Sequence, residues 1–388
     1  MLSSNLMEHL VKRRFWIKAI EDGWKRRSIM WLSGVRRIGK TVLSQSLDKT
    51  EYFDCELPRV RRTMDDPEGF LSSVGRTRIV LDEIHRLRAP AELLKIAADH
   101  YPRLHILATG SSSLGASRKF RDTLTGRKLE LWLTPIILAD LVDFKREHLQ
   151  HRLLRGGLPP FFLSASLPER EFQEWMDAYW AKDIQELFRL ERRYSFQRFA
   201  ELLMARSGGI FEAQTFTTEC EASRSTITNY LRVLEATFVV HIIRPFSSHR
   251  PTEIVSAPKV YGFDTGFVCY HRGWHTLRTE DLGLLWEHFV LNEMQGRLQS
   301  RDIRYWRDKR GHEVDFVLAR RGQSPITIEC KWSDSAFDPT NLKAFRRVYP
   351  NGANYLVAHD VDRPYVRRYG ELTIDILPLP KLIERLLP

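Results

Sequence analysis

A glycine-flanked loop that ends in a lysine and a threonine offers the clearest chemistry in this sequence. It runs from Gly34 to Thr41 with the spacing G-x-x-x-x-G-K-[ST]. Glycine at 34 and 39 allows the backbone N–H groups to turn inward toward a phosphate chain. Lys40 would place a positive charge near the outer phosphates, and Thr41 would offer a hydroxyl to Mg²⁺. The predicted nucleotide-contacting residues are Gly34, Val35, Arg36, Arg37, Ile38, Gly39, Lys40, Thr41 and Val42.

The segments on either side of this loop suit a phosphate site. The apolar run 29–32 precedes the loop and predicts a buried strand. A helical pattern follows, with Val42 and Leu43 and then Leu47, so the positive end of a helix would add to the phosphate site. The alternative is an ordinary turn that carries a surface lysine. The sequence favours an ATP site with Mg²⁺ as its cofactor.

Two adjacent acids follow a second apolar strand, in the pattern called Walker B. Residues 79–81 run directly into Asp82 and Glu83. A buried parallel strand delivers such side chains to the carboxyl edge of the sheet, where ligands bind in open α/β folds. We expect Asp82 to hold Mg²⁺ and Glu83 to activate the attacking water. The alternative is that both acids cap the helix that starts at Ile84.

A third strand, within residues 104–113, ends in hydroxyl side chains. Thr109 and Ser111 are predicted to sense the γ-phosphate or to position water; the alternative is that they cap the next helix. Among the arginines that follow, Arg127 is the best candidate for an arginine finger that acts across a subunit boundary. That role would imply a homo-oligomer. The alternative is a solvated surface arginine.

Composition limits the class of protein. The chain has 388 residues, of which 43% are hydrophobic and 28% charged, as in soluble globular proteins of two or three domains. No apolar run could span a bilayer, and the N-terminus lacks the apolar core of a secretory signal. Four widely spaced cysteines indicate reduced thiols rather than zinc ligands. We therefore expect a cytoplasmic protein that does not enter a membrane.

The formal net charge of +11 favours an anionic partner, most simply nucleic acid. A solvated basic surface is the alternative interpretation. Residues 196–246 are typical of a winged helix, with helices at 196–204, 211–220 and 223–231 and a strand at 239–243. Side chains suited to reading a DNA groove would face outward from the third helix, namely Arg224, Ser225, Thr228 and Asn229. The alternative is a helix-turn-helix that only packs against protein.

Three acids and a lysine stand out in the C-terminal region. Glu287 lies in the predicted helix 284–291, and Asp315 lies in the predicted strand 313–318. Glu329 and Lys331 share one face of the predicted strand 326–331, because side chains alternate along a strand.

Together these features resemble the AAA-type P-loop ATPases. More narrowly, they resemble a prokaryotic branch in which the ATPase is fused to a restriction-endonuclease-like domain at the C-terminus. The matching stretches are 34–41, 79–83, 107–113, 125–127, 133–135 and 154–159, together with the C-terminal acids and lysine. The resemblance implies a small helical lid over residues 137–192, where helical periodicity is interrupted at Gly156 and Pro159.

The C-terminal residues resemble the site of PD-(D/E)XK nucleases, although Val314 stands where that pattern has proline. This resemblance implies that Asp315 and Glu329 bind Mg²⁺, that Glu287 adds a carboxylate, and that Lys331 stabilises charge or helps to deprotonate water. The alternative is that these acids pair with lysine and arginine in a scaffold that no longer cuts.

The predicted fold class is α/β: a P-loop NTPase core with a parallel sheet and a helical lid, then a winged helix and a C-terminal α/β nuclease-like domain. The predicted boundaries are 1–136 for the core, 137–192 for the lid, 193–250 for the winged helix and 251–388 for the nuclease-like domain. The predicted function is that of an ATP-hydrolysing, DNA-binding ATPase. The alternative is a nucleotide-dependent switch or scaffold that binds a partner without cleavage.

Overall fold

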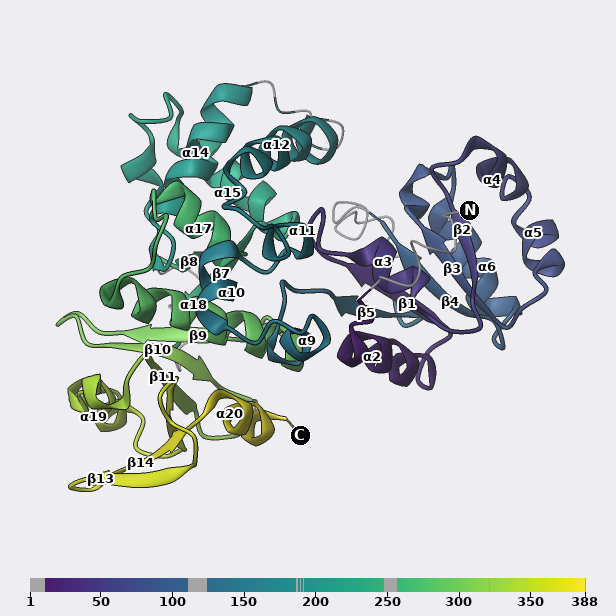
Figure 1. The fold of residues 1–388 in the computed structure, drawn as a ribbon. Helices are drawn as coiled ribbons and strands as arrows, with labels where there is room; N and C mark the ends of the chain where they lie inside the picture. The colour runs from purple at the N-terminus through teal and green to yellow at the C-terminus, as the bar shows by residue number, and fades with distance from the viewer. Residues whose placement is uncertain are drawn as a thin grey trace.

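The structure is a computed structural model that describes residues 11–110, 124–185, 188, 190, 192–247, 257–320 and 322–387. It has two lobes (Figure 1). The first, drawn from purple to blue, is built on one sheet, and the second, drawn from teal to yellow, is built on another. No helix among the described residues has both the length and the apolar character needed to cross a bilayer. The predicted α/β fold class is confirmed.

The first lobe is a five-stranded parallel sheet in the order β2-β3-β4-β1-β5. Its strands are β1 (Ile29–Ser33), β2 (Glu51–Asp54), β3 (Arg78–Asp82), β4 (His105–Thr109) and β5 (Lys128–Trp132). The sheet is accompanied by α2 (Arg14–Trp24), α3 (Lys40–Gln45), α4 (Pro58–Thr63), α5 (Pro67–Ser73), the 3-10 turn η1 (Ile84–Arg86) and α6 (Pro90–His100). Alternate residues of the central strands enter two separate apolar cores, so both faces of the sheet are buried. That is why these strands are continuous apolar runs in the sequence.

Five short helical segments follow β5: α9 (Leu138–Asp143), α10 (Leu149–Arg155), α11 (Pro159–Phe162), α12 (Glu169–Tyr179) and the π-helix η2 (Trp180–Gln185). The break between α10 and α11 comes where Gly156 adopts a left-handed φ of 83°. Asp264 accepts a hydrogen bond from the Gly157 amide (2.5 Å), so this break is attached to the second lobe.

The second lobe begins with α14 (Arg193–Ala205), β6 (Gly209–Ile210), the 3-10 turn η3 (Ala213–Phe216), α15 (Arg224–Ala236), β7 (Val240–Pro245) and β8 (Lys259–Gly262). Helices were expected at 196–204 and 223–231, and both are present. The helix expected at 211–220 is only the short turn η3. The hydroxyls of Thr215 and Thr217 donate to carbonyls three residues back, and such local bonds compete with a regular helix.

The remaining elements are α17 (Thr265–His271), α18 (Thr279–Leu298), β9 (Arg304–Arg307), β10 (Glu313–Leu318), β11 (Ile326–Lys331), the turn η4 (Asp334–Ala336), α19 (Thr340–Val348), β12 (Asn354–Ala358), β13 (Tyr365–Tyr369), β14 (Leu372–Leu377) and α20 (Leu379–Leu386). Nine strands form one mixed sheet in the order β13-β14-β12-β11-β10-β9-β7-β8-β6. Because β7 pairs with both β8 and β9, hydrogen bonds cross the predicted boundary at 250 and 251. That boundary stays a prediction.

Helix α18 connects the two lobes. Its Asn292 amide donates to the carbonyl of Pro135 (3.1 Å), and its Glu293 carboxylate accepts from the amide of Leu138 (2.9 Å). At its C-terminal end, the Gln299 side chain bonds to both the N–H (2.7 Å) and the C=O (3.0 Å) of Trp132 in β5. One helix therefore contacts the end of the first lobe's sheet and also carries Glu287 into the second lobe.

Candidate nucleotide site and C-terminal carboxylate cluster

Two glycines shape the loop between β1 and α3. Gly39 precedes α3 with a left-handed φ of 98°, a conformation that side chains other than glycine rarely adopt. Gly34 has φ 145°, and a Cβ at this position would lie 2.6 Å from the carbonyl oxygen of Leu133. The loop therefore needs glycine at both positions, as the motif predicted.

Lys40 curls back over this loop. Its Nζ donates to the carbonyls of Gly34 (2.8 Å) and Val35 (3.1 Å). Burial lowers the pKa of Lys40, and the nearby carboxylates of Glu83, Asp183 and Asp82 oppose that shift. Burial is the larger effect, so the charged form of Lys40 would be favoured by a bound anion.

The Walker B aspartate is the centre of a hydrogen-bond network. Asp82 Oδ2 accepts from the hydroxyls of Thr41 (2.9 Å) and Tyr52 (2.6 Å), and Oδ1 accepts from the hydroxyl of Thr109. The Thr109 oxygen in turn accepts from the backbone N–H of Glu83 (3.0 Å). Side chains from α3, β2, β3 and β4 therefore meet at the carboxyl edge of the sheet. Tyr52 has no motif around it in the sequence and becomes visible only because β2 pairs with β3.

Glu83 is held in an unusual backbone conformation directly after Asp82. Its φ is 53°, which is rare outside glycine, and its carboxylate lies 3.1 Å from Nδ1 of His85. Burial raises the pKa of Glu83, but the hydrogen bond with His85 and the charge of Lys40 outweigh burial, so the net shift is downward. Glu83 is therefore an ionised carboxylate near neutral pH.

A cavity of about 340 Å³ lies against this network. Of the predicted contact residues, Val35 and Ile38 instead turn their side chains into the core, where 4% and 0% of each residue is exposed. Ser111 lies outside the described residues. Asp82 and Thr109 lie behind Thr41 and Glu83 rather than on the cavity wall. The lining residues are Gly34, Arg36, Arg37, Gly39, Lys40, Thr41, Val42, Glu56, Glu83, His85, Arg86, Gly110, Pro159, Pro160, Lys182 and Asp183.

The helical segments after β5 supply part of the cavity wall that the sequence interpretation missed. Asp183, in the π-helix η2, pairs with Arg36 Nε of the loop (2.9 Å), and Trp175 Nε1 donates to the Arg36 carbonyl (3.1 Å). Lys182 lines the same cavity. These contacts join residues about 140 positions apart, and no local spacing could have indicated them.

A buried arginine supports the loop from its other side. Arg13 donates to the carbonyls of Ile38 (3.2 Å) and Thr134 (3.2 Å), and it pairs with Asp140 (2.6 Å). Both members of this ion pair are buried. Arg13 therefore fixes a carbonyl within the phosphate-binding loop.

Arg127, the predicted arginine finger, does not line the cavity. Its guanidinium makes two hydrogen bonds with the carboxylate of Asp99 (2.7 and 3.1 Å) on α6. A single chain does not test a role across a subunit boundary, so that role stays a prediction.

The structure brings the four predicted C-terminal residues into one cluster. Lys331 Nζ lies 3.2 Å from Glu329 Oε2 and 3.8 Å from Asp315 Oδ2. Asp315 Oδ2 also accepts from the Cys330 amide (2.8 Å), and Glu287 contributes to the field at Asp315. The predicted alternation of Glu329 and Lys331 is correct, since both point to the same side of β11.

A second lysine, which the sequence interpretation missed, enters this cluster from β8. Lys259 Nζ pairs with Glu287 (3.0 Å) and with Glu313 (2.8 Å), and the Tyr261 hydroxyl donates to Glu287. Burial raises the pKa of Asp315. It also raises the pKa of Glu329 well above its ordinary value, and the charge of the neighbouring Asp315 adds to that rise. The pKa of Lys331 is raised, chiefly by the charge of Asp315.

The carboxylates of this cluster are thus already paired with two lysines. Among the described residues, no group of three or more His, Cys, Asp or Glu side chains is arranged to hold a metal ion. One buried oxygen, Glu329 Oε1, has no hydrogen-bond partner in the described part of the chain. The predicted metal ligands Asp315 and Glu329 are therefore adjacent, and the ammonium group of Lys331 lies beside both.

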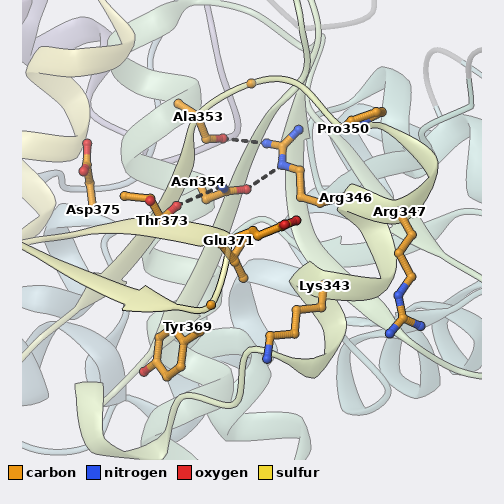
Figure 2. Close-up of a pocket in the computed structure, with 13 residues that line it drawn as sticks. Lys343, Arg346, Arg347, Pro350, Ala353, Asn354, Tyr369, Glu371, Thr373 and Asp375 are labelled. Atoms are coloured by element: carbon orange, nitrogen blue, oxygen red, sulfur yellow. Dashed lines mark hydrogen bonds between the residues drawn. The ribbon is translucent and has the colours of Figure 1, made fainter.

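A larger cavity of about 800 Å³ lies between α19 and the β13–β14 hairpin (Figure 2). Lys343 and Arg347 project from α19 on its rim. Arg346 bonds to the carbonyl of Ala353 (2.8 Å) and to the side chain of Asn354 (2.6 Å). The Arg346 guanidinium therefore holds the loop before β12.

Three of the four residues predicted to face outward from α15 are exposed. Ser223 caps α15 by accepting from the amide of Thr226 (3.2 Å), and Ile227 and Leu234 are fully buried. Arg224, Ser225 and Asn229 are exposed, and Thr228 is half-buried. Their contact with DNA stays a prediction.

Comparison with known protein families gives three matches. Residues 26–142 match an AAA domain. This match supports a P-loop ATPase. Residues 146–278 and 282–382 match two domains of unknown function, DUF8612 and DUF4143.

Two curated relatives are uncharacterised proteins of Mycobacterium bovis and Mycobacterium tuberculosis. Each is 26% identical to this chain over 334 residues, which are 83% of this chain and 74% of the relative. Among solved structures, a Walker-type ATPase of Pyrococcus abyssi is similar with a TM-score of 0.44 and 16% identity, over 68% of this chain and 97% of that one. A DNA polymerase III gamma-subunit-related protein of Thermotoga maritima has a TM-score of 0.24 and 10% identity, over 58% and 97%. At these scores neither likeness adds to what the strand order shows.

Proposed function

We propose that this protein binds ATP in the cavity beside Lys40 and hydrolyses it. The observation that supports this most is the continuous hydrogen-bond chain from Thr41 through Asp82 and Thr109 to Glu83. These hydrogen bonds follow the edge of the sheet, and the residues at either end, Thr41 and Glu83, line the same cavity as Lys40. It joins the two groups that the chemistry needs, a metal-binding hydroxyl and a base, through a shared carboxylate.

Each residue then has a separate task. Lys40 leaves its two carbonyl partners and contacts the phosphates, and Glu83 accepts a proton from the attacking water. Thr41 and Asp82 offer hard oxygen donors 2.9 Å apart, which suit Mg²⁺; when bound, Mg²⁺ would neutralise phosphate charge. Thr109 fixes the Glu83 backbone and thereby aims its carboxylate. Arg127 remains the proposed finger from a neighbouring subunit, and it would have to leave Asp99 to act.

The first test is the turnover of ATP by Lys40→Ala. We expect turnover to fall by at least about 10²–10³-fold, because a charge that stabilises the transferring phosphoryl group is lost. Lys95→Ala is a matched control, since Lys95 is exposed on α6 away from the cavity. Wild-type turnover in Lys40→Ala would overturn the proposal.

We further propose that the second lobe binds DNA. The net charge of +11 and the exposed polar face of α15 support this. Duplex DNA is expected to bind with an affinity that falls steeply with salt and to raise the ATPase rate. Insensitivity of the protein to DNA on both counts would contradict the proposal.

For the C-terminal cluster two functions compete. The order of Glu287, Asp315, Glu329 and Lys331 supports a PD-(D/E)XK-like nuclease site. The pairing of its carboxylates with Lys259 and Lys331 favours the second candidate, a scaffold that binds without cutting. Nicking of DNA with Mg²⁺ or Mn²⁺ that disappears in Asp315→Ala would establish the nuclease. No nicking by the wild type on linear or branched DNA would favour the scaffold.

A further inference from the structure

A polar cavity of about 510 Å³ lies where the two lobes meet. Trp132 at the end of β5 forms one wall, and β7 and the C-terminal end of α18 form others. Arg244 on β7 and Arg301, just after α18, both line it. Glu235 of α15 lines the same cavity and interacts with both arginines. Burial raises the pKa of Glu235, and the charges of Arg301 and Arg244 oppose that rise.

The exposed face of α15 leads into this cavity. Arg224, Thr228, Arg232 and Glu235 succeed one another at intervals of three or four residues, so they form one stripe along the helix. None of them belongs to the buried face of α15. The face that begins at the predicted groove-reading residues therefore ends at the junction cavity.

Four arginines along this path have side chains with no hydrogen bond or ion pair to any described residue: Arg224, Arg232, Arg244 and Arg301. Arg304, which lines the same cavity, differs from them, because it pairs with Asp302 (2.9 Å). Arg301 is held over the rings of Trp132 (4.9 Å) and Phe238 (4.6 Å). Stacking of this kind orients a guanidinium while leaving its in-plane N–H groups available.

We infer that the DNA footprint of this protein extends along α15, where Arg232 contacts a backbone phosphate, into the junction cavity, where Arg244 and Arg301 contact further phosphates. This inference rests on the proposed DNA binding and assigns its location. Unpaired arginines in a row suit the evenly spaced charges of a nucleic-acid strand, because each phosphate contact releases condensed counterions. Arg301 acts here as a pre-oriented phosphate ligand.

The location connects DNA to the ATPase lobe. Arg301 stacks on Trp132, the residue whose backbone Gln299 holds. Trp132 pairs in register with Ser33, the last residue of β1 before the phosphate-binding loop. A phosphate bound at Arg301 therefore lies against the strand that neighbours the nucleotide loop.

The test is the salt dependence of binding to a fluorescein-labelled duplex. Fluorescence anisotropy would be measured from about 50 to about 200 mM salt. Each of Arg232→Gln, Arg244→Gln and Arg301→Gln is expected to lower the log–log salt slope by about 0.9 and the affinity at 0.1 M salt by about 8-fold. Glu235→Gln is expected to tighten binding, because it removes a negative charge beside Arg244 and Arg301. Arg103→Gln and Glu92→Gln are matched controls on the ATPase lobe, where both side chains are exposed.

The outcomes separate the two proposals. If the wild type shows no salt-dependent binding, the proposed DNA binding itself fails. If the wild type binds but the three arginine variants behave like Arg103→Gln, the footprint is wrong while DNA binding stands, and the arginines serve another partner. Tighter binding by Glu235→Gln but not by Glu92→Gln supports the footprint, and misfolding cannot produce that gain.

Discussion

The nucleotide cavity and the C-terminal cluster are both built from acids and lysines at strand ends, yet they use their charges in opposite ways. In the first, Lys40 donates to two neutral carbonyls, and Glu83 and Thr41 line a cavity. In the second, Lys259 and Lys331 are already paired with carboxylates inside the protein. A lysine held by carbonyls can move to a ligand at small electrostatic cost, whereas a lysine that left buried carboxylates would leave their charge uncompensated. The contrast teaches that residue type alone does not distinguish a binding site from an internal ion-pair network.

The largest expected effect tests whether the nucleotide cavity is a reactive site. Glu83→Gln should lower the kcat of ATP hydrolysis by about 10²–10⁴-fold, because the variant cannot accept the proton of the attacking water. Nucleotide binding should persist, since Lys40 and the loop are unchanged. Steady-state turnover and binding of a fluorescent ATP analogue measure the two quantities. Retained turnover would remove Glu83 from the role of base.

The second prediction tests whether the lysines of the C-terminal cluster are needed for the stability of the fold. Lys259→Met should lower the free energy of unfolding by about 3–5 kcal/mol, because Glu287 and Glu313 lose a buried partner. Urea denaturation followed by tryptophan fluorescence measures this, with the exposed Lys309→Met as the control. A stability like that of the wild type would mean that Lys259 is a functional group rather than part of the fold.

The third prediction concerns the helix that joins the two regions. Burial raises the pKa of Glu293 to about 7, although its hydrogen bond from the Leu138 amide opposes the shift. The folded protein therefore binds this proton more tightly than the unfolded chain does, and stability should fall as pH rises from about 4.5 to about 7. The expected loss is about 3 kcal/mol, from about 1.4 kcal/mol for each pKa unit.

Glu293→Gln should remove this part of the pH dependence, because its side chain does not titrate. The free energy of unfolding of wild type and variant, measured by urea denaturation at about pH 5, 6 and 7, gives the difference. Parallel curves for the two proteins would show that Glu293 does not titrate in this range.

The smallest effect tests how far the Asp82 network reaches. Tyr52→Phe removes one of three hydroxyls that bond to Asp82 and should reduce kcat/KM by about 5-fold, equivalent to about 1 kcal/mol. Tyr101→Phe is a suitable control, since that hydroxyl bonds to Ser72 away from the cavity. An unchanged kcat/KM in Tyr52→Phe would show that, of the three hydroxyls, those of Thr41 and Thr109 are the ones that matter for turnover.

Much of the nucleotide site was predictable because its residues lie in short contiguous motifs. The loop from Gly34 to Thr41 and the pair Asp82 and Glu83 each carry a spacing that only a few backbone geometries satisfy. Tyr52, Asp183 and Arg13 could not be found this way, since each reaches the site through strand pairing or helix packing. Lys259 was missed for the same reason, because it arrives from a strand some 28 residues before Glu287.

The sequence by itself determined the α/β class, the phosphate-binding loop and the strand that carries Asp82 and Glu83, because hydrophobic period and glycine placement act locally along the chain. Only the tertiary structure decided which charges are free and which are paired. It turned Lys259 and Lys331 inward onto carboxylates and left Arg232, Arg244 and Arg301 without ion partners among the described residues. The physical reason is that a Coulomb interaction depends on distance in space and on burial, and neither is encoded in the spacing of residues along the sequence.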